Sequence, residues 1–161
     1  MKTRVICALV LGLGLCAGVA NAAGPKDYAK GSGSVAPGGV VQDFSFNAES
    51  DPAGGSPKGT MHWKTPTFEI DATVTCMSVV TIPGFERDAL LIGDILRTTG
   101  AAPAGDGLSF QLTDTGGTVA SSFGDFFEAS VIPESLPEHD CAPMGALGAH
   151  VTGGDITIID E

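Results

Sequence analysis

Two carboxylates two positions apart have the spacing in this chain that most suggests catalysis. On an extended segment, Glu69 and Asp71 would project from the same face, with Cα atoms roughly 6.5–7 Å apart. Paired carboxyl groups can act as general acid and base in glycoside hydrolysis. The same alternation of polar residues occurs on any solvated sheet face. A small carboxylate-dependent hydrolase acting on an extracellular polymer is therefore one alternative function.

A histidine and the only tryptophan of the chain stand side by side at His62 and Trp63. An indole can stack on a sugar ring while a neighbouring imidazole forms hydrogen bonds, which would make the pair a ligand contact. Because successive residues of a strand face opposite sides, the alternative places Trp63 in the core and His62 in solvent. We keep both interpretations, with His62 and Trp63 as the candidate ligand-contact residues.

Cation binding is a third kind of chemistry that the acidic residues suggest. Asp106, Asp114 and Asp125 lie in or near glycine-rich turns, but the chain lacks the D-x-D-x-D-G run of a calcium loop. A calcium-stabilised extracellular module is a further alternative. The densest set of transition-metal ligands, within residues 134–141, is nearly contiguous, and adjacent side chains diverge. We assign no metal ligand and no cofactor.

Familiar catalytic motifs are absent from the sequence. It contains no G-x-S-x-G, no H-E-x-x-H, no C-x-x-C and no phosphate-binding glycine loop. The chain has three histidines, so few pairs of a nucleophile with a histidine base are available for covalent catalysis. We therefore expect a non-catalytic protein and name no catalytic residue.

Strands must position these side chains, because the apolar pattern has period two through most of the chain. The clearest alternation places Phe68, Ile70, Ala72, Val74 and Cys76 on one face, with Cys76 toward the core. Strands are predicted at 40–48, 60–64, 68–80, 89–98, 108–113, 126–132 and 156–159. The turn signals between them indicate an all-β fold, an antiparallel β-sandwich or small β-barrel of seven to eight strands.

The first 22 residues have the pattern of a secretory signal peptide. Lys2 and Arg4 precede an apolar run over 5–19, and Ala20-Asn21-Ala22 supplies small residues at positions −3 and −1. We expect cleavage after Ala22 and a secreted, extracellular protein. The apolar run of about 15 residues is shorter than the ~20 that cross a bilayer as a helix, so no membrane span is expected.

The remaining chain divides by composition into two parts. Residues 23–39, rich in glycine, serine and proline, are expected to form a flexible leader, and residues 40–161 a single β domain. Cys76 and Cys141 are the cysteines left after cleavage, and two cysteines in an exported domain most simply pair.

The charge of the exported chain limits its partners. Six basic residues against 19 acidic ones leave a formal net charge of −13 once the signal peptide is removed. Nucleic acids and anionic lipids are bound through clusters of Lys and Arg, so neither is expected as a partner. We expect a monomeric secreted or wall-associated module that binds an unidentified extracellular ligand or protein, or that has a structural role.

An ordered set of short motifs resembles a known group of proteins. The motifs are Phe44-x-Phe46, 57–60 leading to Trp63, 74–79, 89–93, 110–116, 125–127, Cys141 and 154–158. Together they are similar to small, largely uncharacterised secreted β-rich proteins of high-GC Gram-positive bacteria. The resemblance covers most of residues 40–160. It implies secretion, an all-β fold and a Cys76–Cys141 disulfide, with no catalytic residues to carry over.

Overall fold

The computed structural model describes residues 26–83, 86–116, 124–133, 141 and 148–161. The expected signal peptide, residues 1–22, lies outside these residues, as do 134–140 of the acidic segment. No helix in the described ranges is long and apolar enough to cross a membrane.

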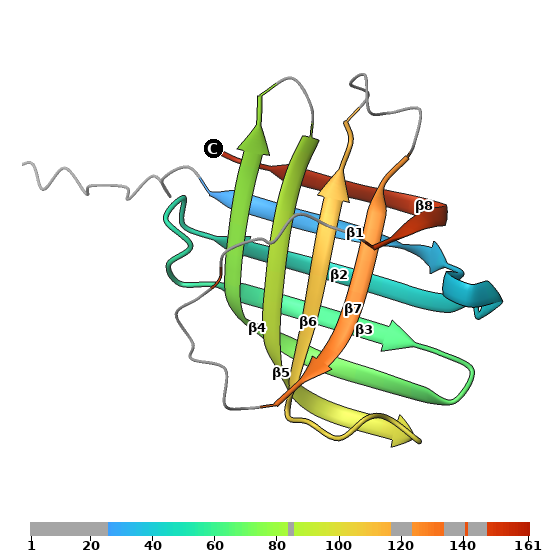
Figure 1. Cartoon of the computed structure of the whole chain (residues 1–161). Helices are drawn as coiled ribbons and strands as arrows, with labels where there is room; N and C mark the ends of the chain where they lie inside the picture. The colour runs from blue at the N-terminus through green and yellow to red at the C-terminus, as the bar shows by residue number, and fades with distance from the viewer. Residues whose placement is uncertain (1–25, 84–85, 117–123, 134–140, 142–147) are drawn as a thin grey trace, which may run out of the picture.

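Eight antiparallel strands form one closed sheet, which confirms the all-β prediction (Figure 1). The strands are β1 (Asp27–Val35), β2 (Gln42–Ser50), β3 (Lys58–Lys64), β4 (Phe68–Ile82), β5 (Glu86–Gly100), β6 (Gly107–Asp114), β7 (Phe126–Ile132) and β8 (Ala149–Ile159). Each strand pairs with the next along the chain, and β8 pairs with β1 to close the barrel. A short 3₁₀ turn, η1 (Pro37–Gly39), connects β1 to β2.

The barrel is flattened into two crossed layers (Figure 1). One layer contains β8, β1, β2 and β3, and the other contains the upper parts of β4 and β5 with β6 and β7. β4 and β5 are the longest strands and bend from one layer into the other. Such corners are characteristic of crossed sheets whose strands bend at bulges.

Large apolar side chains fill the space between the two layers. The ring of Phe44 stacks on that of Phe127 with centroids 4.0 Å apart, and Phe110 meets Phe127 edge to face at 4.9 Å. Met61, Ile70 and further fully buried side chains complete this core. The alternating apolar residues of β2 and β3, which include Phe44, Phe46, Met61 and Trp63, therefore face the core.

The expected flexible leader is wrong for residues 27–35, which form β1. This strand pairs along its whole length with β2 and also with β8. Its inward positions include Gly31 and Gly33, whose missing side chains leave room for the rings of Phe46 and Phe44. A Cβ atom on Gly31 would lie 2.8 Å from Phe46 Cζ. The inward face of β1 therefore combines Asp27, Ala29, Gly31, Gly33 and Val35, a series with no run of large apolar residues to detect.

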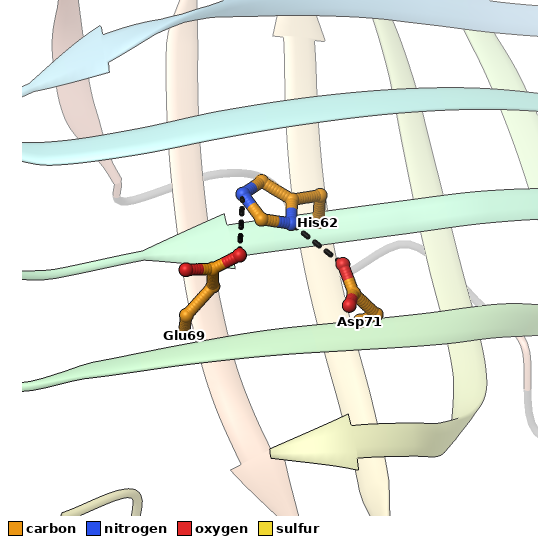
Figure 2. Close-up of side chains that lie close together, drawn as sticks. All are labelled: His62, Glu69 and Asp71. Atoms are coloured by element: carbon orange, nitrogen blue, oxygen red, sulfur yellow. Dashed lines mark hydrogen bonds and ion pairs between the residues drawn. The ribbon is translucent and has the colours of Figure 1, made fainter. Parts of the chain in front are cut away.

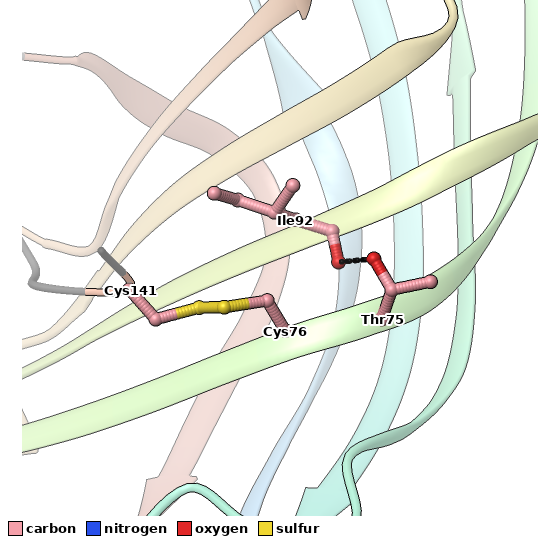
Figure 3. Close-up of a disulfide and its surroundings, with 4 residues drawn as sticks. All are labelled: Thr75, Cys76, Ile92 and Cys141. Atoms are coloured by element: carbon pink, nitrogen blue, oxygen red, sulfur yellow. Dashed lines mark hydrogen bonds between the residues drawn. A yellow bond between two sulfur atoms is a disulfide. The ribbon is translucent and has the colours of Figure 1, made fainter. Parts of the chain in front are cut away.

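The predicted core-facing position of Cys76 is also wrong. The pairing of β4 with β5 skips one residue between Val74 and Cys76, so Thr75 is a bulge. Val74 and Met77 both point into the core, and Cys76 lies half-buried on the outer side. Cys76 forms a disulfide with Cys141, with Cα atoms 6.3 Å apart (Figure 3). This separation lies within the usual range for disulfides, and the expected pairing is confirmed.

Candidate functional site

A cleft of ≈ 500 Å³ opens beside β7, on the side away from its partner β6. It lies between the ends of β1, β2 and β3 on one side and the middle of β7 on the other. Apolar and polar surface contribute almost equally to the lining, which includes Val35, Pro37, Gln42, Trp63, Phe127, Glu128, Ala129, Gly148 and Ala149. A cleft of this size with a few polar groups is typical of small-ligand and peptide sites.

Trp63 is held in this cleft by a polar contact and an aromatic contact. Its indole N–H donates a hydrogen bond to Gln42 Oε1 at 3.1 Å, and its ring meets Phe68 edge to face at 4.9 Å. Only 7% of the residue is exposed, so a ligand would touch one edge of the ring. Val40 and Val41, which lie in sequence between the lining residues Pro37 and Gln42, are 49% and 56% exposed.

Among the residues that the structure describes, β7 and β8 form the shortest pairing of the barrel. β7 pairs with β6 over seven residues, and its described pairing with β8 is at Phe126 and Phe127. Beyond this contact β8 turns toward β1, and side chains take over the role of a neighbouring strand. Asp125 Oδ2 accepts the main-chain N–H of Ile156 at 3.0 Å, and Asp114 Oδ2 accepts that of Ile158 at 2.9 Å.

These two aspartates therefore have a structural role at the barrel seam. Their other carboxylate oxygens also accept protein donors, since Asp114 Oδ1 bonds the N–H of Gly116 at 2.8 Å. Asp125 Oδ1 likewise accepts the N–H of Thr115 at 3.2 Å. A polar groove of ≈ 470 Å³ lies over this region. Because backbone donors already use both oxygens of each carboxylate, Asp114 and Asp125 give the calcium alternative no support.

The outer face of β3, β4 and β5 carries a cluster of four charged or titratable side chains. His62, Asp71 and Arg97 are direct cross-strand neighbours, and Glu69 is two residues from Asp71 on the same face. Figure 2 shows the imidazole of His62 between the two carboxylates. A bulge at Leu96 shifts the pairing of β5 so that Arg97, and not Leu96, stands opposite Asp71.

Ion pairs account for the geometry of this cluster. His62 Nδ1 lies 2.7 Å from Asp71 Oδ1 and donates to it, because an ionised carboxylate can only accept. Arg97 Nε donates to Asp71 Oδ2 at 2.7 Å, and Arg97 Nη2 lies 3.5 Å from Glu69 Oε1. The hydrogen bond from His62, followed by that from Arg97, holds the pKa of Asp71 below its usual value.

This arrangement does not favour catalysis or metal binding. A general acid needs a raised pKa, whereas that of Asp71 is lowered. Glu69 and Asp71 approach opposite ring nitrogens of His62, with Glu69 Oε1 4.0 Å from Nε2. One potential ligand atom from each of His62, Glu69 and Asp71 lies within 4.8 Å of the others, but Arg97 already supplies a positive charge to both carboxylates. We describe the four residues as an ion-pair cluster.

The structure separates the two candidate ligand-contact residues. Trp63 points inward and lines the cleft, while His62 points outward into the ion-pair cluster. The sequence indicated this alternation but not the partners on either side. Gln42 and Phe127, which shape the cleft with Trp63, are distant in sequence, and only the strand pairing brings them together.

Comparisons with known proteins add no identity to this geometry. No protein family model, no curated protein and no solved structure matches the chain. Functional inference therefore depends on the cleft, the seam and the ion-pair cluster.

Proposed function

We propose that the chain is the precursor of an exported, non-catalytic binding module whose ligand enters the cleft beside Trp63. The cleft itself carries this proposal, because it combines a concave, partly apolar surface with the only indole of the chain. The barrel interior is filled by side chains, so an opening at the seam is where a ligand can be received.

The remaining features support a role in binding outside the cell. The signal-like first 22 residues and the high negative charge fit an exported soluble module. A disulfide between Cys76 and Cys141 fits an oxidising compartment. The carboxylates with potential catalytic spacing are held in ion pairs on the outer face, away from the cleft.

The neutral dye N-phenylnaphthylamine tests the cleft directly. We expect its emission to rise on binding and the fluorescence of Trp63 to fall through energy transfer, since Trp63 is the only tryptophan. Ala149→Leu, which adds bulk to the cleft wall, should weaken dye binding at least about tenfold. Ser45→Leu makes a comparable change at an exposed outer position of β2 and serves as the matched control.

The result that contradicts the proposal is equally clear. If dye binding is absent, or if both variants bind the dye as wild type does, the cleft is not a ligand site. The export component has a separate test, which is N-terminal sequencing of the protein secreted by a bacterial host. A mature chain that does not begin at Ala23 would contradict the expected cleavage.

A further inference from the structure

We propose that a hollow on the outer face of β8, β1 and β2 binds a neutral glycan, with one sugar ring packed against Tyr28. The hollow shares no lining residue with the cleft beside Trp63, so the two sites are separate. A sugar bound here would give the chain a second function in recognition, whatever occupies the cleft.

The hollow has a volume of ≈ 380 Å³ and lies over a strand that is paired with both of its neighbours. β1 runs between β8 and β2 and pairs with each of them from Tyr28 to Ser34, so the floor is continuous sheet (Figure 1). Every lining residue belongs to a strand that the structure describes. Six side chains form the walls, namely Tyr28, Lys30 and Ser32 of β1, Asn47 of β2, and Asp155 and Thr157 of β8.

Side-chain length explains why the sheet is hollowed at this point. Ser32 lies opposite Ser45 of β2 and Asp155 of β8, so a row of short side chains crosses the three strands. Lys30 and Tyr28 occupy the next outward positions of β1, and their long side chains rise beside this row. A flat ligand can therefore lie over the short row with its edge against the longer side chains.

The polar groups around the hollow are not used by the protein itself. Within the described strands, no hydrogen bond or ion pair engages the side chains of Lys30, Asn47 or Asp155, and all three are exposed. The ammonium of Lys30 lies 5.9 Å from the centroid of the Tyr28 ring, near the outer limit of a cation–π contact, so it is free to turn toward a ligand. The ion-pair cluster on β3, β4 and β5 differs, because its charged groups already bind one another.

This combination of groups matches the surface of a sugar. The C–H groups of a sugar ring are apolar and pack against an aromatic ring, while its hydroxyl groups both donate and accept hydrogen bonds. Tyr28, the only tyrosine of the chain, presents a half-buried ring on this face. Lys30 can donate to a hydroxyl oxygen, Asp155 can accept from a hydroxyl group, and Asn47 can do both.

The balance of charge favours a neutral glycan over an anionic one. The walls carry one ammonium and one carboxylate, from Lys30 and Asp155, so their charges cancel. The whole chain has a formal net charge of −11, and its field repels polyanions. A uronic-acid polymer would meet a single cation in this hollow, which is too few to offset that repulsion.

Isothermal titration calorimetry with cellohexaose, maltohexaose and hexa-N-acetylchitohexaose tests the site. We expect at least one of these neutral sugars to bind saturably, and the anionic hexagalacturonate not to bind. Tyr28→Ala should weaken sugar binding at least about tenfold, whereas Tyr28→Phe keeps the ring and should bind nearly as wild type does. Asp155→Ala should also lose about tenfold, because a charge-assisted hydrogen bond is removed. Asp94→Ala, at an exposed position of β5, is the matched control and should have no effect.

The opposite results would overturn the proposal. These are failure of all three neutral sugars to bind, equal binding by Tyr28→Ala and wild type, or tighter binding of hexagalacturonate than of the neutral sugars. Sugar binding that is lost in Ala149→Leu but kept in Tyr28→Ala would place the sugar in the cleft, which contradicts this site and supports the proposed function. If Tyr28→Ala fails to fold, the exposed change Asp155→Ala decides the question.

Discussion

Replacing Gly31 by alanine tests the account of β1 as a strand packed under aromatic rings. A Cβ at this position would lie 2.7 Å from the main-chain oxygen of Asp155 and 2.8 Å from Phe46 Cζ. Both distances are shorter than ordinary contacts, and the first partner is backbone that cannot rotate away. Overpacking of this kind costs about 1–3 kcal/mol. The lower entropy of the unfolded chain with alanine offsets about 0.4–1 kcal/mol of that cost.

We therefore expect Gly31→Ala to lower the free energy of unfolding by about 1–2 kcal/mol, and the melting temperature by about 3–8 °C. Denaturant titration followed by Trp63 fluorescence measures this change. Gly153→Ala is the matched control, because a Cβ there would meet nothing within 4 Å and its φ is not positive. This control should leave stability unchanged or raise it by up to about 1 kcal/mol.

A double-mutant cycle identifies the contact responsible. Phe46→Leu removes the ring tip that the new Cβ would meet, so it should destabilise Gly31→Ala less than it destabilises wild type. A Gly31→Ala protein as stable as wild type, beside a control that behaves as expected, would refute the packing of β1 described above.

Three further predictions concern the disulfide and two aspartates. Replacing Cys76 and Cys141 together by alanine should lower the free energy of unfolding by about 4 kcal/mol, because their bond spans a sequence separation of 65 residues; an unchanged denaturation midpoint would contradict it. Burial raises the pKa of Asp27, so this carboxyl group loses its proton at a higher pH in the folded state than in the unfolded state. The free energy of unfolding therefore falls as pH rises from 3.8 through the folded pKa. Asp27→Asn should therefore stabilise the protein at neutral pH and not below pH 3.8, and thermal melts against pH would show no such difference if the carboxyl is not desolvated. Asp125→Ala should cost about 1–3 kcal/mol and speed hydrogen exchange at the Ile156 amide, whereas slow exchange there would show that another group accepts this N–H.

Much of the fold could be predicted where large apolar residues alternate with polar ones. Phe44 and Phe46 in β2, and Met61 and Trp63 in β3, indicated both the strand and its inward face. β1 could not be recognised in this way, because glycines on its inward face match aromatic rings that belong to another strand. The aromatic rings that pack against these glycines belong to β2, so the residues of β1 alone do not indicate a strand.

The site was less predictable because it depends on the pairing of strands. A single bulge at Thr75 exchanges the inward and outward positions of the later residues of β4. Cys76 therefore lies on the outer side of the sheet, although the alternation before the bulge predicts the core side. The bulge at Leu96 likewise decides that Arg97 meets Asp71. Asp114 and Asp125 were recognised as residues near turns, but their partners on β8 are 44 and 31 residues away. Local sequence contains no signal for such distant partners.

The pairing of β1 with β8 has a consequence for the order in which the molecule can form. Tyr28 lies opposite Ile159, so the first strand acquires one of its two neighbours only from the last residues of the chain. A polypeptide that emerges from a ribosome or a translocation channel N-terminus first would have to keep β1 half-paired until almost all of it has appeared. Closure by contacts so distant in sequence is slow. Whatever the rest of the sheet has formed by then, the barrel cannot close before β8 is available to pair with β1.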